Sequence, residues 1–369
     1  MQKKRICYFI GSLQTGGAEK HVLQLIENID KNKFEVHLCL LTKVDRHKVE
    51  EVKRLYSIEN VKTFNVKQFF GIFYLIKLIS FAFYLRINKI KILHIHLVGS
   101  MFFASLAGKI SNVSQILITW HSIYKYRTIK KRTLKNILIN LNLFTGSIFC
   151  DKAIAVSNRV KIENCKNLKV KEDKVIVVYN GIDLPQKSNK VVDKDSFILG
   201  AVGNLYEDKG YINLLRSIPE VIQSIPNLKV ILIGEGNERC KLEKYISDHN
   251  LENYVNLVGR KNNVRELIPE FDIWIMVSLR EGFSLAVLEA MAASLPVIAT
   301  DVGGNSEAII NEESGLIIKS KNTEDIVSSI KYLYLNKEKR EQFASKAYGR
   351  YKDNFTTQKM MKGLYQLYK

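Results

Sequence analysis

The sequence has few cysteines, and none of them is paired by spacing. No two have the separation of a CxxC motif or of metal ligands, and their number is odd. Scattered single cysteines argue against a disulfide framework of the kind that staples small secreted domains, so we expect a protein of the reducing cytosol. The five residues are Cys7, Cys39, Cys150, Cys165 and Cys240.

Long apolar runs, low-complexity tracts and repeats of solenoid spacing are also missing. The segment Phe69 to Arg86 is apolar on most faces, but Lys77 interrupts it and it is short for a transmembrane span. Two interpretations stay open for this segment. It is either a helix buried in the N-terminal domain, or an interfacial helix lying in a membrane surface, since basic residues flank it and aromatic residues suit that depth.

The N-terminal segment resembles a signal peptide only superficially. Its apolar run is about eight residues long, at the short limit for such a peptide, and no convincing small-x-small cleavage site follows it. The run leads instead into "TGGAEKHVLQLI". We therefore expect a buried first strand, a glycine turn and a helix.

Acidic residues are scarce in one half of the chain. The formal net charge is +19, and residues 1–185 hold 31 Lys and Arg against 13 Asp and Glu, whereas residues 186–369 hold 25 against 24. This asymmetry indicates an anionic partner for the N-terminal half, unless it only serves solubility. The basic cluster in Tyr124 to Leu138 is either a dock for anionic lipid or a solvated helix face.

Short apolar, β-rich runs alternate with helix-sized segments along the whole chain. This pattern is typical of βαβ units on parallel sheets, and it restarts after a polar linker near residues 183–195. We predict an α/β protein of two Rossmann-like, doubly wound domains that face each other across a cleft. The predicted domains are residues 1–184 and 192–355, and the helix at about 356–369 either finishes the second domain or packs on the first.

The stretch "REGFSLAVLEAMA" places two carboxylates on either side of a predicted helix start. It follows the strand "DIWIMVS", so a helix that begins near Ser284 would point the amides of its first turn towards the strand ends, where an anion is favoured. Glu281 precedes that helix and Glu289 lies inside it. A carboxylate can accept hydrogen bonds from two neighbouring hydroxyls, which suits a sugar nucleotide. The alternative is a capping Glu281 and a solvated Glu289.

Glycine-containing turns follow several other predicted strands. They favour close approach of the backbone to a phosphate-bearing ligand, although each alone is compatible with simple turn chemistry. They are "GSLQTGGAE" in the first domain and "VGNLYEDKG", "LIGEGNER" and "TDVGGNSE" in the second.

Taken in order, these motifs resemble family 4 of the retaining glycosyltransferases, also called group 1. The similarity is densest from about residue 175 to 320 and looser over the N-terminal domain, which in such enzymes reads the acceptor. The resemblance implies two Rossmann-like domains of the GT-B fold, a nucleotide sugar as substrate and no metal requirement. The motifs are "GGAE", "NGID", "GNLYEDKG", "LIGEG", "EGFSLAVLEAMA", "LPVIAT", "GGNSE" and "SGLII".

The resemblance implies a role for each of several residues in the second domain. Glu289 would bind the ribose diol of the donor, and Glu281 would hold hydroxyls of the donor sugar. Lys209 would neutralise the diphosphate. The turn around Gly203 and Asn204 would lie beside it. Three residues at the helix start would add their amides: Phe283, Ser284 and Leu285.

In the first domain the resemblance implies that Gly17 approaches the phosphate and that His121, in "ITWHS", lies near the transferred sugar; a structural histidine is the alternative there. Glu19 either touches the acceptor or stabilises a helix start. His94 and His96 alternate on a strand, and we assign them to packing or acceptor binding, because two histidines without a further ligand do not make a metal site.

Two positions depart from the family pattern. Such enzymes usually carry an arginine where Asn204 stands, so Lys209 alone remains on that motif, and Arg260 or Arg280 are candidates to replace the missing charge. Ser294 stands where glycine is common after a helix, because that residue is often left-handed. A DxD motif, "DKD" at 193–195, falls in the linker, where we assign it no metal.

The sequence therefore predicts a retaining, metal-independent hexosyltransferase. It would move a sugar, from a UDP-sugar by expectation, to a lipid-linked or polysaccharide acceptor in bacterial surface glycan synthesis, such as O-antigen, capsule or exopolysaccharide. We expect it in the cytoplasm, peripheral on the inner face of the plasma membrane. Fixed cations and helix amides would stabilise the leaving diphosphate during front-face substitution.

Two other functions stay open. One is a nucleotide-sugar epimerase of the same fold. The other is a basic nucleic-acid binder, against which the balanced charge of the second half and the lack of recognisable base-reading elements argue.

Overall fold

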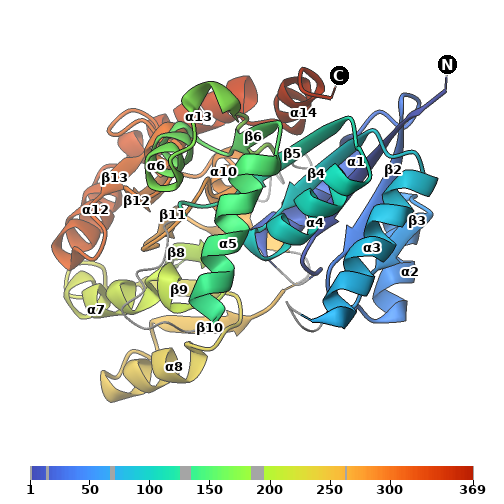
Figure 1. The fold of residues 1–369 in the computed structure, drawn as a ribbon. Coiled ribbons are helices and arrows are strands. Elements are labelled where there is room, and N and C mark those ends of the chain that lie inside the picture. The colour runs from blue at the N-terminus through green and yellow to red at the C-terminus, as the bar shows by residue number, and fades with distance from the viewer. Residues whose placement is uncertain are drawn as a thin grey trace. The chain divides into compact units, whose positions relative to one another are not determined.

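The structure is a computed structural model that describes residues 2–13, 16–66, 71–124, 134–183, 195–261 and 264–368. Its contacts divide the chain into two compact units; Figure 1 shows the ribbon, coloured by residue number. Unit 1 comprises Met1–Tyr179 and Met360–Lys369, and unit 2 comprises Asn180–Lys359. The expected linker residues 184–194, including most of the "DKD" motif, and the basic residues at 125–133 lie outside the described residues.

Unit 1 contains a seven-stranded sheet in the order β3-β2-β1-β4-β5-β6-β7, with parallel pairing throughout. Consecutive residues of β1, β4 and β5 are buried, so both faces of the sheet are covered, which explains their continuous apolar runs. The strands are β1 (Lys4–Ile10), β2 (Phe34–Leu40), β3 (Asn60–Thr63), β4 (Ile92–His96), β5 (Gln115–Trp120), β6 (Lys152–Ala155) and β7 (Val175–Val177).

The helices of unit 1 follow its strands one by one. Helices α3, α4 and α5 pack side by side in that order, and α2 packs beside α1 (Figure 1). The helices are α1 (Gly17–Asn28), α2 (Arg46–Tyr56), α3 (Ile72–Ile87), α4 (Val98–Ile110), α5 (Leu134–Phe149) and α6 (Asn158–Leu168), with a 3₁₀ turn η1 (Glu172–Lys174).

Unit 2 repeats this arrangement with a six-stranded parallel sheet in the order β10-β9-β8-β11-β12-β13. Its core forms where α7 and α12 pack on the sheet. The strands are β8 (Phe197–Val202), β9 (Leu228–Ile233), β10 (Val255–Gly259), β11 (Ile273–Met276), β12 (Val297–Thr300) and β13 (Leu316–Ile318).

The helical elements of unit 2 include several short ones that shape its loops. They are η2 (Glu207–Lys209), α7 (Tyr211–Val221), α8 (Arg239–Asp248), α9 (Val264–Leu267), η3 (Ile268–Glu270), α10 (Leu285–Ala292), α11 (Asn305–Ala308), α12 (Thr323–Leu335), α13 (Lys337–Asn354) and α14 (Thr357–Tyr365).

Both sheets have the strand order of a Rossmann-like fold, with the order reversing between β1 and β4 and between β8 and β11. This confirms the predicted fold class. Two edge strands, β3 and β13, were not predicted as strands. The first, "NVKT", is short and half-exposed, so its pattern carries little of the apolar signal by which strands are recognised.

The end of the chain belongs to unit 1. Met360, Met361 and Leu364 lie in the same apolar core as β1 and α1. The hydroxyl of Tyr368 is 2.8 Å from His94 Nδ1 and 3.2 Å from the hydroxyl of Tyr8. Of the two possibilities left by the sequence, the last turns of α14 therefore pack on the N-terminal fold.

Helix α3 contains the apolar segment for which two interpretations were open. Tyr74, Leu78 and Phe81 are buried against the rest of unit 1, whereas Phe73 and Phe83 on the opposite face are exposed. The first interpretation therefore holds for the buried face of the helix, and the second stays a prediction for the exposed face. Within the part of the chain that the structure describes, no helix has the length and apolar character needed to cross a bilayer.

Candidate functional site

The residues predicted to act on the donor gather at the switch point of the sheet in unit 2. Gly203 and Lys209 follow β8, and Ser278 and Glu281 follow β11, the two strands between which the strand order reverses. In open parallel sheets the crevice for a ligand forms outside the carboxyl ends of such neighbouring strands.

Lys209 and Glu281 form an ion pair at this point. The distance from Lys209 Nζ to Glu281 Oε1 is 2.7 Å, and both side chains are largely buried. Ser278 Oγ donates to the same carboxylate oxygen at 2.8 Å. Burial alone would lower the pKa of Lys209, but the charge and hydrogen bond of Glu281 outweigh it and raise that pKa above its ordinary value. The lysine therefore stays an ammonium ion at neutral pH.

Close backbone packing holds the loop of Lys209 against the end of β11. The amide of Leu279 donates to the carbonyl of Asp208 at 2.7 Å. Gly210 ends the 3₁₀ turn η2 with φ +68°, and a Cβ there would collide with the carbonyl oxygen of Val277. Only glycine meets both conditions, so this position fixes where Lys209 projects.

Two further glycines shape the same region. A Cβ on Gly203 would come within 2.9 Å of the Tyr211 hydroxyl and within 3.9 Å of the Lys209 side chain. Gly203 therefore leaves room for the Tyr211 hydroxyl, whereas the distance to Lys209 is that of an ordinary van der Waals contact. Gly303, with φ +55°, approaches the carbonyl oxygen of Glu281 so closely that a Cβ would collide with it.

Helix α10 begins where the sequence predicted. Ser284 is its N-cap, and the Ser284 hydroxyl accepts from the amide of Val287. Glu281 is thus not the capping residue. Glu289 lies in the second turn and is buried, with 7% of its surface exposed. The alternative of a solvated Glu289 is therefore wrong. The positive end of the helix dipole and the amides around Phe283 and Leu285 therefore lie directly after Glu281.

The cations proposed to replace the missing arginine are accessible. Arg260 and Arg280 are both exposed at loops that follow β10 and β11. Asn204 stands in the turn after β8, where its carbonyl accepts from the amide of Tyr206 at 2.8 Å. Ser294 follows α10 with φ +55°, as predicted for a left-handed residue at that position.

Unit 1 brings four histidines together at its own switch point. His94 and His96 come from β4, His121 follows β5, and His21 lies on α1. His96 Nδ1 is 3.0 Å from His121 Nε2, and the rings of His21 and His121 are 5.1 Å apart. His94 Nε2 lies 2.7 Å from the hydroxyl of Thr119, so this ring is tied into the core.

Burial keeps these imidazoles uncharged. It lowers the pKa of His21 to about 4 and, with repulsion from His21, that of His94 to about 3. Burial and neighbouring histidines also hold the pKa of His96 and His121 well below the usual range. His21 Nδ1 and His96 Nε2 are buried and have no hydrogen-bond partner among the described residues. At neutral pH the cluster can exchange hydrogen bonds with a ligand but supplies no positive charge.

The glycine turn of unit 1 opens α1. Gly16 is the N-cap and Gly17 is the first helical residue, with open space where a Cβ would stand. The carboxylate of Glu19 folds back over Gly16, and burial raises its pKa. This position matches the interpretation of Glu19 as a residue of the helix start.

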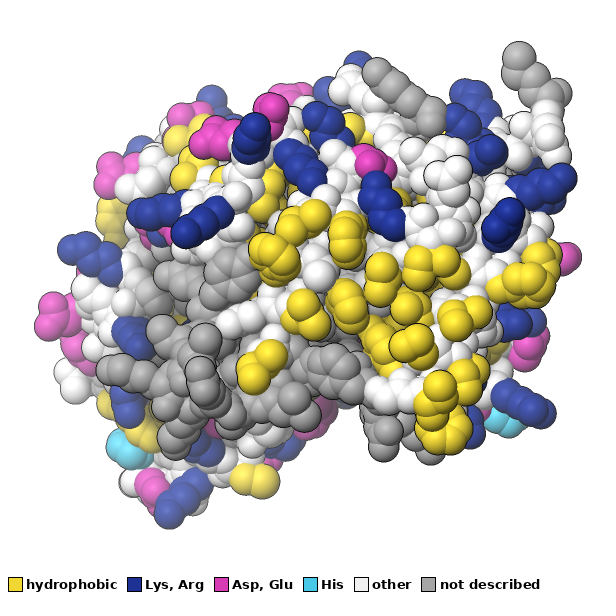
Figure 2. Space-filling view, in the orientation of Figure 1, with side chains coloured by type: hydrophobic (Ala, Val, Ile, Leu, Met, Phe, Trp, Pro, Cys, Tyr) yellow, Lys and Arg dark blue, Asp and Glu magenta, His cyan; other side chains and the backbone are white. Residues whose placement is uncertain are grey.

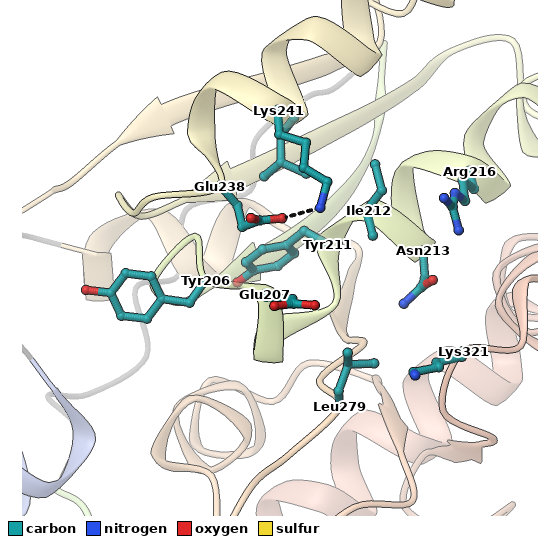
Figure 3. A pocket seen from close by; sticks show the side chains of 11 residues that line it. Tyr206, Glu207, Tyr211, Ile212, Asn213, Arg216, Glu238, Lys241, Leu279 and Lys321 are labelled. Atoms are coloured by element: carbon teal, nitrogen blue, oxygen red, sulfur yellow. Dashed lines mark hydrogen bonds and ion pairs between the residues drawn. The ribbon is translucent and has the colours of Figure 1, made fainter. Parts of the chain in front are cut away.

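A separate cavity of about 220 Å³ lies along α7, shown in Figure 3. Arg216 and Asn213 project into it from α7 and Lys321 from the opposite wall, while Lys241 pairs with Glu238 at 2.7 Å. Tyr211 and Leu279 also border it. None of the predicted site residues lines this cavity, so it is distinct from the Lys209–Glu281 pair.

Among the described residues no group of three or more His, Cys, Asp or Glu side chains is arranged to hold a metal ion. All five cysteines carry free thiols, and only Cys240 is exposed.

Sequence analysis missed three residues that support the site. Ser278 bonds Glu281, and His21 joins the histidine cluster. Asn180 donates to the carbonyl of Phe283 at 2.9 Å, while its own Oδ1 has no partner among the described residues. Signals were present: Ser278 ends the strand motif "DIWIMVS", Asn180 opens "NGID", and His21 follows Gly17 by one helical turn.

Family profiles match nearly the whole chain in two adjoining parts. The profile described as Glycosyltransferase Family 4 matches residues 15–186, and the profile described as Glycosyl transferases group 1 matches residues 184–350. The division agrees with the two units of the structure.

Curated relatives cover most of the chain. One relative is the N-acetylgalactosamine-N,N'-diacetylbacillosaminyl-diphospho-undecaprenol 4-alpha-N-acetylgalactosaminyltransferase of Campylobacter jejuni. The present chain is 28% identical to it over 358 residues, which cover 94% of both chains. It is 24% identical over 332 residues to the UDP-Gal:alpha-D-GlcNAc-diphosphoundecaprenol alpha-1,3-galactosyltransferase of Escherichia coli, covering 85% of this chain and 84% of that one.

Solved structures share the fold. The structure of HepE from Anabaena in complex with UDP and glucose superposes with a TM-score of 0.85 at 18% identity, covering 99% of both chains. With two family profiles, full-length relatives and this fold, the chain belongs to the group 1, family 4 glycosyltransferases and has the GT-B fold.

Proposed function

We propose that this glycosyltransferase transfers a hexose from a UDP-sugar to a lipid-linked glycan acceptor, with retention of the anomeric configuration. The observation that carries the proposal is the buried Lys209–Glu281 pair at the switch point of unit 2, directly before the N-terminus of α10. It combines a fixed ammonium, a carboxylate and helix amides, the groups that a sugar diphosphate requires.

The chemistry follows from where charge develops. Cleavage of the bond between sugar and diphosphate leaves negative charge on the nucleotide and positive character on the sugar. A preorganised cation and helix amides stabilise the departing diphosphate without having to reorganise. Lys209 is suited to this role because Glu281 keeps it protonated. In the proposal Glu281 orients sugar hydroxyls and Glu289 orients the ribose.

In unit 1 we assign His121 a place near the transferred sugar. Its neutral imidazole suits a hydrogen bond to a hydroxyl rather than stabilisation of a negative charge. Gly17 is assigned to the phosphate. No residue in this proposal acts as a covalent nucleophile, so front-face substitution assisted by the leaving diphosphate is the mechanism we favour.

The relatives support the substrate classes. The name of the E. coli relative specifies UDP-Gal as donor, and both relatives' names specify an undecaprenol-linked acceptor and an alpha linkage. The Anabaena structure was solved with UDP. We propose the same substrate classes for the present chain, without specifying the sugar or the linkage. The enzyme would then act in surface glycan synthesis at the inner face of a membrane.

The test is transfer of radiolabelled sugar from UDP-sugars to membrane lipid extract. Lys209→Ala and Glu281→Ala should each reduce transfer by about two to three orders of magnitude. The matched control is Lys331→Ala, which removes an ion pair with Glu220 between α12 and α7 on the same unit. Full activity in both site variants would refute the assignment.

Two companion measurements narrow the substrate. Thermal shifts with UDP, GDP and ADP identify the nucleotide, because the one that binds the fold raises its melting temperature by mass action. Incubation of donor without acceptor identifies an epimerase: a new nucleotide sugar in that reaction would contradict the transferase proposal.

A further inference from the structure

We propose that helices α3, α4 and α5 of unit 1 form a docking surface for an anionic lipid bilayer. The inference deepens the proposed function and rests on it in one respect: a lipid-linked acceptor resides in a bilayer, so an enzyme that uses it gains from binding there. Figure 2 shows the surface as a broad field of hydrophobic side chains over these helices.

The centre of the surface is an exposed apolar stripe on α3. Ile72, Ile76, Ile79, Phe83 and Ile87 recur in steps of three and four residues, so they share one face of the helix, and Phe73 and Leu75 lie at its two sides. Their exposed fractions run from 49% for Leu75 to 73% for Phe73. We call this the α3 stripe, and it consists of Ile72, Phe73, Leu75, Ile76, Ile79, Phe83 and Ile87.

The stripe is additional to the face that α3 uses for folding. Tyr74, Leu78, Phe81 and Leu85 already pack into unit 1 from the opposite side. A surface helix of a globular domain normally needs one apolar face, and the other is polar. A second apolar face on the outside costs solubility and marks a surface that meets an apolar partner.

Neighbouring helices extend the apolar area. Ile137, Phe144 and Ile148 are about half exposed on α5, and Ile110 is exposed at the end of α4. The packing of α3 on α4 and of α4 on α5 places these elements side by side (Figures 1 and 2). The apolar area therefore crosses three helices, which is broader than a groove for a single peptide.

The charge of this part of the chain selects the partner. Between Glu59 and Asp151 the sequence contains no Asp or Glu but 13 Lys and Arg. Arg86 and Lys89 are exposed at the end of α3, and Lys77 is half-buried beside the stripe. A second copy of the chain would bring these positive charges against each other, which is unfavourable. An anionic bilayer accepts the apolar stripe and attracts the basic residues around it.

The test is flotation of the full chain with vesicles that contain neither donor nor acceptor, so its result is independent of the proposed reaction. Vesicles of equal parts phosphatidylcholine and phosphatidylglycerol should bind the chain, and pure phosphatidylcholine should bind it at least about tenfold more weakly. The triple variant Phe73→Ser, Ile79→Ser, Phe83→Ser should lower binding to the anionic vesicles at least about tenfold.

A matched control removes three equally exposed apolar residues elsewhere. It is Leu55→Ser, Ile162→Ser, Leu335→Ser, on α2, α6 and α12, whose exposed fractions of 60%, 59% and 76% compare with 73%, 59% and 64% for the stripe residues. Vesicle binding by this control should stay within twofold of the wild type. An equal loss in both triple variants would overturn the assignment of the stripe.

A second pair of variants tests the charge without touching an apolar residue. Arg86→Glu with Lys89→Glu should weaken binding to anionic vesicles at least about tenfold, in a salt-dependent way, because each basic residue near the surface contributes roughly fivefold. Lys321→Glu with Lys352→Glu, two exposed lysines of unit 2, is the control and should leave binding unchanged.

Three results would overturn the proposal. The first is a wild type that floats with neither kind of vesicle, and the second is unchanged binding when Arg86 and Lys89 are both replaced by Glu. The third is light scattering that shows a dimer which the stripe variant dissociates, because the occupant would then be a second copy. Thermal melting of each variant, with the wild-type transition retained, verifies that the fold persists.

Discussion

The two units have the same strand order at their switch points but fill those points with opposite chemistry. Unit 2 holds a charged pair, Lys209 and Glu281, in which each ion stabilises the other. Unit 1 holds four imidazoles that burial keeps neutral, His96 and His121 among them. The fold therefore supplies the location of a site, and the side chains at the strand ends decide what the site can do.

The difference extends to the surfaces. Unit 1 carries the α3 stripe and the excess positive charge, whereas the sequence of unit 2 is close to neutral. A polar ligand such as a sugar nucleotide suits the charged strand ends of unit 2, and a bilayer suits the outside of unit 1. Four predictions test this contrast, from the largest expected effect to the smallest.

Acid should destabilise unit 1 more than unit 2. The folded pKa values of His21 and His94, about 4 and about 3, lie below the unfolded value near 6.5, so the unfolded chain binds more protons between these limits. Their contribution is complete above pH 6.5 and is lost as the pH falls. Between pH 6.5 and 4.5 the two histidines together should cost roughly 5 kcal/mol of unfolding free energy.

The two tryptophans separate the units in this measurement. Trp120 is buried in β5 of unit 1 and Trp274 in β11 of unit 2, so Trp274→Phe leaves a reporter for unit 1 alone. On that background His21→Leu should reduce the pH dependence of urea unfolding by about one proton. The exposed His47→Leu is the control. Equal acid sensitivity of the unfolding transitions reported by Trp120 and Trp274 would contradict the claim that acid destabilises unit 1 more than unit 2.

Gly303→Ala should destabilise unit 2 by about 3 kcal/mol, because the residue is left-handed and its Cβ would collide with the carbonyl oxygen of Glu281. Urea unfolding followed at Trp274 measures the loss. Gly349→Ala, in open space on α13, should instead stabilise by roughly 0.5–1 kcal/mol. If both substitutions act alike, the backbone around Glu281 is not held as tightly as the structure indicates.

Glu289→Gln should weaken UDP binding by about tenfold, since a carboxylate that accepts from two hydroxyls becomes a neutral amide. Isothermal titration of the variant with UDP measures this. Glu313→Gln, at an exposed position of the same unit, is the control and should bind UDP like the wild type. Unchanged UDP affinity in the Glu289 variant would show that Glu289 does not bind the nucleotide.

Ser294→Gly should stabilise unit 2 by roughly 0.5–1 kcal/mol, because Ser294 has φ +55° and glycine adopts this conformation without strain. The neighbouring Ala293 has φ −81°, so Ala293→Gly should destabilise by a similar amount. Thermal melting at Trp274 compares the two variants. Destabilisation by both would mean that the Ser294 side chain makes contacts worth more than its strain.

Much of the site in unit 2 was predictable because its signals are local. The helix start at Ser284 follows from a capping residue before an apolar run, and the left-handed Ser294 from its place after the helix. The short strand β3 was missed because its four residues carry little apolar signal, and β13 because its apolar run of three residues is shorter than the runs by which strands are recognised. The roles assigned to Lys209, Glu281 and Glu289 in donor binding stay predictions for the experiments above.

The sequence by itself determined the alternation of strands and helices, the two-domain fold and the family, because periodicity and turn motifs act over a few residues. Only the tertiary structure decided which distant groups meet. Lys209 and Glu281 are 72 positions apart, and the histidine cluster draws on α1, β4 and the residue after β5. Likewise the sequence of α3 is apolar on most sides of the helix. Only its packing against α4 decided which side is buried and which is exposed. Strand order and helix packing depend on contacts across the whole core, which no local pattern contains.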